Sequence, residues 1–553
     1  MKRVASGKWP LLFFLLVLLY AVYYAPYGIN ETDGGFLTGL AWQVLQGKIL
    51  YQDLVYIRPP LPVWLRALEL QALPSSWAIL GERWIFYLKV AAYSWLAAAV
   101  LAKGRDRWRL ATFGFVVSAH CYPAAAWHSV DGILCAVLSA WCLFNKPGFW
   151  GSMLAGVTLF TALLCKQSFY PLAFFGLAAA WFLAQRGRAV VGLLTGFLLG
   201  TVLFFSYLYK NGLIAGFLRM TNGAASSGQA LQHGVLDYFH IQPGLAGLSV
   251  VLLLVAWLWR DKHANVAYAA WMTWLAALIG SYAFAIWQRQ DFTAPFAQAR
   301  LLFWLACGFL VFQIIQRLNT KHQIPNTKHI VSALFLLAIA WCAAVSWGYN
   351  LPILLATPGV WAVLEINRRL YERMAAKFTG QRIRQVASRW GSALALVALV
   401  ALLAVFRWGY EFVYRDGRRS AMTEDLGRIF PALRGIRSDL ETATRYGELK
   451  MLTNRYGPHC KTLPAFPQAN FLTNTLPPLP LDWVASREMN ADSTLVMNAL
   501  KRAQPVLLIE KSYLSAIETD PELALVRSVF HSATRLGETT NFLVMRPATP
   551  KEE

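Results

Sequence analysis

The sequence predicts a polytopic α-helical membrane protein that carries a small folded domain at its C-terminal end. Of its 553 residues, 57% are hydrophobic and only 14% are charged, whereas soluble domains have roughly 25% charged residues. Lysine and arginine give a formal net charge of +22 and gather in short segments between apolar runs. This placement suits membrane topology better than nucleic-acid binding. We therefore expect contact with membrane lipids and no nucleic-acid partner.

The apolar runs give the number of spans. A spanning helix needs about 20 mostly apolar residues, and scanning on this basis gives about thirteen candidates. These are 10–25, 85–102, 110–126, 130–144, 150–165, 169–185, 189–209, 244–259, 266–286, 300–316, 330–347, 351–366 and 391–408. No small-residue cleavage site follows the first run, so we interpret it as an uncleaved transmembrane helix and not as a signal peptide.

The basic segments give the orientation. They fall in alternate loops, at 103–109, 146, 186–188, 260–262, 317–328 and 368–389. The positive-inside rule makes these loops and the N-terminus cytoplasmic. The other loops are then outside, and the odd number of spans exports the C-terminal tail.

Two domains follow from this topology: a transmembrane catalytic domain, 1–410, and an exported domain, 411–553. The first outer loop, 26–84, is long, and its apolar residues recur at helical spacing, which predicts amphipathic helices on the membrane surface from about residue 36 and over 61–73. In the tail, short apolar runs at 505–510 and 541–545 are separated by charged stretches. Such runs are typical of strands that alternate with helices, so we expect a small α/β domain.

Two acids and two cations stand out at the predicted outer ends of the spans. Glu31 and Asp33 precede Gly34-Gly35, and glycine lets the backbone turn sharply and leaves room for a base that activates a hydroxyl. The alternative is a pair of solvated loop acids that cap a helix. Arg58 lies before Pro59-Pro60 and offers a planar, permanently charged fork to a phosphate; the alternative is an arginine that snorkels at the interface.

The other two residues come from later loops. Asp131, in His128-Ser129-Val130-Asp131, is either a functional acid at the membrane edge or a carboxylate stabilised by a helix N-terminus. Lys166-Gln167 separates two apolar runs, and Lys166 either snorkels or binds an anion delivered through the lipid. Acids that activate an acceptor and cations that hold a lipid phosphate together predict a lipid-linked transfer reaction.

Other chemistries lack their sequence signals. The chain has no Gly-x-x-x-x-Gly-Lys-Ser/Thr loop, no Gly-x-Ser-x-Gly elbow and no His-Glu-x-x-His motif, so nucleotide-driven or hydrolase chemistry is not indicated. The seven cysteines are scattered without a Cys-x-x-Cys pair, and we expect neither a disulfide framework nor a zinc site.

The first 170 residues resemble the bacterial GT-C glycosyltransferases, which include protein O-mannosyltransferase-like enzymes and the lipid A aminoarabinose transferase. The resemblance is carried by Glu31-x-Asp33, by Tyr51-x-Asp53, by Arg58-Pro59-Pro60-Leu61 where the family has lysine, by Asp131, and by Cys165-Lys166-Gln167. It is only topological over 171–410 and weak in the tail. It implies a GT-C fold in a bacterial inner membrane, with a periplasmic active site and a periplasmic C-terminal domain.

The family mechanism implies a role for each matching residue. Asp33 is the expected base or acceptor-orienting acid, with Glu31 and Asp131 as further acids. Arg58 and Lys166 hold the donor phosphate, and Asp53, Gln167 and His128 support them. The donor is a polyprenyl-phosphate sugar, transferred with inversion to a periplasmic lipid, polysaccharide or protein. No metal is required, although Glu31 and Asp33 offer carboxylates to a divalent cation, as some branches of the superfamily use.

Two other functions remain open at this stage. A transporter or lipid flippase would predict repeat symmetry and broken helices near the midplane, and neither is visible in the sequence. A non-enzymatic membrane protein that presents the C-terminal domain would leave the loop acids with structural roles. Acceptor binding is expected to involve the tail and the 210–243 loop, with Gln229, His233, Asp237 and His240, but the sequence favours no acceptor class.

Overall fold

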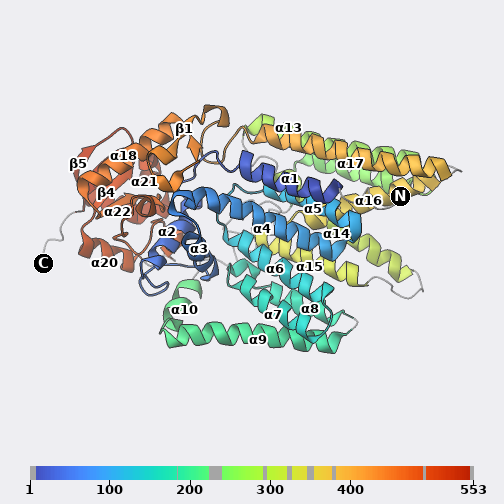
Figure 1. Ribbon diagram of the computed structural model, residues 1–553, viewed down its shortest axis with the longest axis horizontal. Coiled ribbons are helices and arrows are strands. Elements are labelled where there is room, and N and C mark those ends of the chain that lie inside the picture. The colour runs from blue at the N-terminus through green and yellow to red at the C-terminus, as the bar shows by residue number, and fades with distance from the viewer. Residues whose placement is uncertain are drawn as a thin grey trace.

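The computed structural model describes residues 8–183, 185–222, 239–290, 296–319, 327–345, 354–376, 381–489 and 493–547. Its helices form an elongated bundle, and the C-terminal domain lies at one end of that bundle (Figure 1). The first loop, with α2 and α3, lies where the two parts meet.

A helix overlaps each of the thirteen predicted spans. They are α1 (Lys8–Tyr23), α4 (Ala78–Leu101), α5 (Gly104–Ala119), α6 (His128–Asn145), α7 (Phe149–Leu163), α8 (Leu172–Trp181), α9 (Arg186–Lys210), α12 (Pro243–Leu258), α13 (Ala264–Arg289), α14 (Phe296–Asn319), α15 (Thr327–Ala344), α16 (Thr357–Ala376) and α17 (Gln381–Gly409). Within the described residues, five helices are long and apolar enough to cross a membrane: Ser75–Leu101, His128–Asn145, Arg186–Lys210, Ala264–Arg289 and Gln298–Gln316. The predicted total of about thirteen spans and their orientation stay predictions.

The first loop contains α2 (Asp33–Leu45) and α3 (Leu61–Ala72), and a short 3₁₀ helix, η1 (Ser75–Trp77), leads into α4. Most of α2 is buried, and a Cβ added at Gly39 would lie 2.3 Å from the carbonyl oxygen of Pro467. The C-terminal domain therefore covers part of this helix, and its place on the membrane surface stays a prediction. In α3, Leu68 is exposed as expected and Arg66 is buried.

The C-terminal domain has the expected α/β composition. A four-stranded sheet has the order β3-β4-β6-β5, with β3 (Cys460–Leu463) parallel to β4 (Val506–Glu510) and with β5 (Thr534–Glu538) and β6 (Phe542–Arg546) antiparallel. All five residues of β4 are buried, which explains its continuous apolar sequence. The other elements are α10 (Ile214–Asn222) at the end of α9, β1 (Glu424–Asp425), β2 (Arg437–Ser438), α18 (Leu440–Tyr456), α19 (Ala469–Leu472), α20 (Thr494–Ala503), α21 (Leu514–Thr519) and α22 (Ala524–Ser532).

The chain after α17 fixes the start of the first loop. The Gly28 amide donates to the Arg437 carbonyl at 2.8 Å, and the Arg437 amide donates to the Pro26 carbonyl at 2.7 Å. The Asp416 carboxylate accepts the Ile29 amide at 2.6 Å. These bonds hold the backbone immediately before Glu31 and Asp33, so both acids lie at the junction of bundle and C-terminal domain.

Candidate active site

Asp33 is the first residue of α2, where the unpaired amides of the helix N-terminus favour a negative charge. Its carboxylate accepts the Tyr414 hydroxyl at 3.1 Å and lies 3.0 Å from the Arg415 guanidinium. The Asp33 side chain keeps 19% of its surface exposed. It is therefore an oriented carboxylate that a substrate can still reach.

Arg58 is held on several sides. Its two terminal nitrogens donate to the two carboxylate oxygens of Glu488 at 2.6 and 2.8 Å, and the Phe36 ring centroid lies 5.3 Å from the guanidinium carbon. Burial lowers the pKa of Arg58, but the Glu488 carboxylate outweighs it, and Asp33 adds to the same effect, so the pKa lies above its usual value. The contribution of Asp33 places it in the electrostatic range of Arg58.

Lys166 lies in the loop between α7 and η2 (Gln167–Phe169). Its ammonium donates to the Val345 carbonyl at 3.0 Å and to the Ser129 hydroxyl at 3.5 Å. Burial and, to a smaller extent, the nearby charge of Arg58 lower the pKa of Lys166 to about 7. Among the described residues no carboxylate lies within ion-pair distance of this ammonium, so the site has a partly buried cation whose described contacts are neutral acceptors.

Two predicted supporting residues do contact the segment around Arg58. The Gln167 amide donates to the Ile57 carbonyl at 2.6 Å. His128 and the Tyr56 hydroxyl share a hydrogen bond of 2.7 Å. Gln167 therefore holds the backbone next to Arg58, and His128 holds the Tyr56 side chain. Asp53 lies apart, in an exposed turn where its carboxylate accepts the Ile49 amide at 2.9 Å.

Asp131 belongs to a separate cluster, which we call the α3–α4–α6 network. Its members are Arg66 and Glu69 of α3, Glu82 and Lys89 of α4, and Asp131 of α6. Lys89 lies 2.6 Å from Asp131 and 2.7 Å from Glu69, and Arg66 lies 2.6 Å from Glu82. Every charge of the network has an opposite charge within ion-pair distance, and the Asp131 side chain is only 3% exposed.

Glu31 and Asp33 have different partners. It pairs with Arg445 of α18, which also lies 2.9 Å from Glu510. Burial raises the pKa of Glu31 to about 7 although Arg445 opposes this rise. In this structure Glu31 and Asp33 each pair with a different arginine, and a divalent cation at these two acids stays a prediction. In the described part of the chain no group of three His, Cys, Asp or Glu side chains has metal-binding geometry.

The sequence reasoning missed the partners from the C-terminal region, namely Tyr414, Arg415, Arg445 and Glu488. Glu488 lies 430 positions from Arg58, and its segment has no periodicity that would distinguish it from a solvated loop. Only the structure brings these residues to the first loop.

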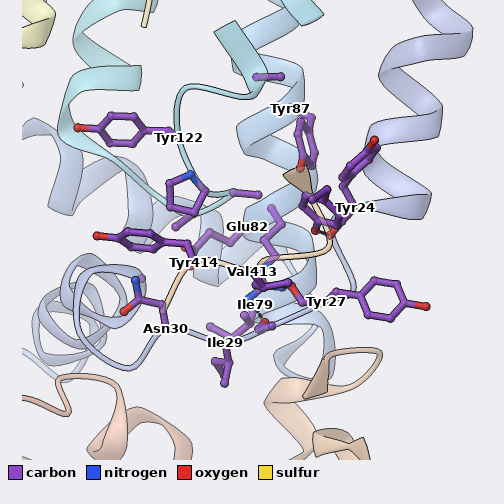
Figure 2. A pocket seen from close by; sticks show the side chains of 18 of the residues that line it. Tyr24, Tyr27, Ile29, Asn30, Ile79, Glu82, Tyr87, Tyr122, Val413 and Tyr414 are labelled. Carbon is purple, nitrogen blue, oxygen red and sulfur yellow. Dashed lines mark hydrogen bonds between the residues drawn. The ribbon is translucent and has the colours of Figure 1, made fainter. Parts of the chain in front are cut away.

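A small cavity of about 50 Å³ is lined by Asn30, Gly34 and Tyr414; Asp33 does not line it but accepts the Tyr414 hydroxyl. Figure 2 shows Asn30, Tyr122 and Tyr414 among the side chains around it. The Asn30 carboxamide oxygen accepts from Thr32, while its buried nitrogen has no hydrogen-bond partner among the described atoms. The cavity has room for a few atoms of a polar group, and an oxygen there would satisfy the Asn30 nitrogen.

Solved structures share this architecture. The oligosaccharyltransferase of Archaeoglobus fulgidus in its apo form matches with a TM-score of 0.51 and 11% identity, over 99% of this chain and 75% of that chain. The chain has the GT-C fold. The same enzyme tethered to an acceptor peptide with the NVT sequon matches with a TM-score of 0.50 and 10% identity, over 99% of this chain and 74% of that one.

A third match is ArnT from Cupriavidus metallidurans in the apo state, with a TM-score of 0.44 and 13% identity over 98% of both chains. The sequence matches no profile of a known protein family and no curated protein sequence. The match to the apo oligosaccharyltransferase confirms the GT-C fold expected from the first 170 residues. That match covers 99% of this chain, the tail included.

Proposed function

We propose that the protein is a membrane glycosyltransferase that transfers a sugar from a polyprenyl-phosphate donor to an acceptor at the outer face of a bacterial inner membrane. The observation that carries the proposal is Lys166, a partly buried ammonium whose bonds within the described part of the chain go only to a carbonyl and a hydroxyl. A buried charge without a counter-charge is costly. A bound phosphate would supply the missing charge, and the GT-C fold makes a lipid-linked sugar phosphate the matching donor class.

The donor phosphate would lie between Lys166 and Arg58. Lys166 provides the net positive charge, since the charge of Arg58 is already balanced by Glu488. Arg58 provides directed N–H donors in a fixed plane. Gln167 and His128 keep the adjacent backbone in place through Ile57 and Tyr56. Fixed donors aimed at the departing phosphate stabilise the charge that develops in the transition state.

Asp33 would act as the base. It removes the proton from an acceptor hydroxyl, the hydroxyl oxygen attacks the anomeric carbon, and the bond from that carbon to the phosphate oxygen breaks. The electron pair leaves with the polyprenyl phosphate, next to Lys166 and Arg58. A single displacement of this kind inverts the anomeric configuration. The leaving group is already activated, so the paired general acid of glycoside hydrolysis is not needed.

Asp131 would have a supporting role, because Lys89 holds it in the α3–α4–α6 network. That network joins α3, which begins just after Arg58, to the bundle. Glu31 would likewise act through Arg445, by tying the first loop to the C-terminal domain. The acceptor class stays open among lipid, polysaccharide and protein. One matching oligosaccharyltransferase structure is tethered with an acceptor peptide, which supports an acceptor site in a protein of this fold.

The test uses purified protein in lipid vesicles with membrane extract and a panel of radiolabelled polyprenyl-phosphate sugars. We expect the wild-type protein, and the exposed-site control Glu441→Gln on α18, to release polyprenyl phosphate. Asp33→Asn should not. If no donor is turned over and labelled lipid instead crosses the vesicle bilayer, the protein is a flippase or transporter and the proposal fails.

A further inference from the structure

The ion pair between Arg58 and Glu488 joins the first loop to the C-terminal domain at the candidate donor site. Both side chains are largely buried, with 12% and 5% of their surfaces exposed. The contact is bidentate, with one carboxylate oxygen on each terminal nitrogen of the guanidinium. This geometry fixes the plane of the guanidinium as well as its position.

Glu488 is itself held by its own domain. It belongs to the 3₁₀ helix η6 (Ser486–Met489), and the preceding amide, that of Arg487, donates to the Glu522 carboxylate at 2.8 Å. The Trp483 ring packs edge-on against Phe36 at 6.1 Å between centroids, and Phe36 is the ring next to the Arg58 guanidinium. Arg58 therefore rests on a platform built partly from the C-terminal domain.

We propose that Glu488 is a positioning residue of the donor site, which orients Arg58 so that its remaining N–H groups face a phosphate bound at Lys166. The proposal rests on the proposed function and extends it by making the C-terminal domain part of the donor site. Two of the guanidinium nitrogens donate to Glu488, and a guanidinium has five N–H donors in a rigid fork. Donors therefore remain for a second acceptor.

A competing arrangement would have the phosphate displace Glu488 from Arg58. The burial of Glu488 argues against it, because displacement would leave a carboxylate that is only 5% exposed without its cation, and an unpaired buried charge is costly. Retention of the pair also leaves the net charge on Lys166, where no carboxylate among the described residues balances it. The two cations then have different roles, because Lys166 attracts the phosphate and Arg58 orients it.

The pair also affects Lys166 through charge. Among the described residues, burial and then the charge of Arg58 lower the pKa of Lys166, and His128 lies within the electrostatic range of Lys166. Ser129 and Val345 supply the neutral contacts of Lys166. Glu488 balances Arg58, so its replacement by a neutral residue exposes Lys166 to the full Arg58 charge. The proton of Lys166 should then be lost at a lower pH.

The experiment measures the binding of radiolabelled polyprenyl phosphate to the full-length protein in phosphatidylcholine nanodiscs from about pH 5 to about pH 9, a window in which perturbed groups titrate. Glu488→Asp keeps the negative charge but moves the carboxylate away from Arg58, because the aspartate side chain is shorter. It should weaken binding by roughly 10–100-fold, as expected when a ligand-orienting group is displaced by about 1 Å. Glu488→Gln should shift the alkaline loss of binding to lower pH. Arg58→Lys, which cannot form the fork, should remove the effect of Glu488→Asp.

A matched control comes from another buried acid of the same domain. Asp482 pairs with Lys461 and is 1% exposed, so Asp482→Asn tests general damage to the domain. It should lower thermal stability and leave the pH dependence of binding unchanged. Wild-type affinity and pH dependence in both Glu488 variants would overturn the proposal, as would tighter binding with an unshifted profile. If the wild-type protein binds no polyprenyl phosphate at any pH, the donor assignment itself is wrong.

Discussion

Two clusters of charged residues lie near the first loop, and they differ in whether their lysine has a carboxylate partner. In the α3–α4–α6 network, Lys89 lies within 2.7 Å of two carboxylates. In the candidate donor site, the described residues offer Lys166 only a carbonyl and a hydroxyl as bonding partners. A partly buried lysine is common to both, so burial alone does not mark a binding site. We propose that the missing counter-charge does, because a fold tolerates it only at an energetic cost.

The same comparison separates the two acids that the sequence grouped together. Asp33 is partly exposed and its partners come from the chain just after α17. Asp131 is buried and paired inside the network. In the proposed mechanism the first reacts, and the second holds helices together.

The largest expected effect is on turnover in Asp33→Asn. General-base catalysis contributes about 10²–10⁴-fold, and the rate of polyprenyl-phosphate release should fall by that factor while polyprenyl phosphate still binds. Initial rates and binding are measured on the same preparation. A fall in binding that matches the fall in rate would contradict the assignment of Asp33 as the base.

Breaking the network should affect stability instead of chemistry. Lys89→Gln leaves Asp131 and Glu69 without their shared cation, and loss of one partner of a buried pair costs about 3–5 kcal/mol. The free energy of unfolding, followed by denaturation in mixed micelles, should fall by that amount. Asp131→Asn should lower stability less, since Lys89 keeps Glu69. A folded Asp131→Asn protein that has lost all turnover would show that Asp131 takes part in the chemistry.

The comparison of the two clusters also predicts a pH dependence at Lys166 that Lys89 lacks. Its pKa is lowered from 10.5 to about 7, so binding of polyprenyl phosphate should decline as the pH rises through about 7. Between pH 7 and 10.5 the unfolded chain holds the proton that the folded protein has lost, so stability should rise with pH in this window. Lys166→Gln should remove both trends. A binding profile that stays flat across pH 7 in the wild-type protein would contradict the predicted ionisation.

The smallest effect is expected at Asp53, which the resemblance grouped with the site. The carboxylate lies in an exposed turn on the Ile49 amide, and Asp53→Asn keeps an acceptor there. Stability should change by no more than about 0.5 kcal/mol, with turnover unchanged. A large loss of turnover would mean that the first loop rearranges when substrate binds.

Hydrophobicity and topology were enough to predict much of this molecule. The apolar runs predicted the helices, because a bilayer requires long uninterrupted apolar segments, and the alternation of basic loops grouped Asp33, Arg58 and Lys166 at one end of the bundle. The contacts between distant segments could not be predicted. Arg58 pairs with Glu488, which is 430 positions away. The C-terminal domain covers part of α2, and nothing in the α2 sequence indicates this contact. His240 contacts Arg300 through its carbonyl, whereas Gln229, His233 and Asp237 lie outside the described residues.

The most direct test compares the two buried lysines in one experiment, with Lys166→Gln and Lys89→Gln assayed for polyprenyl-phosphate binding and for thermal stability. We predict that Lys166→Gln abolishes binding and is at least as stable as the wild-type protein, because it removes an unbalanced charge. We predict that Lys89→Gln is destabilised and, where folded, still binds. Normal binding by Lys166→Gln, or equal destabilisation by both substitutions, would contradict the claim that the unpaired lysine marks the donor site.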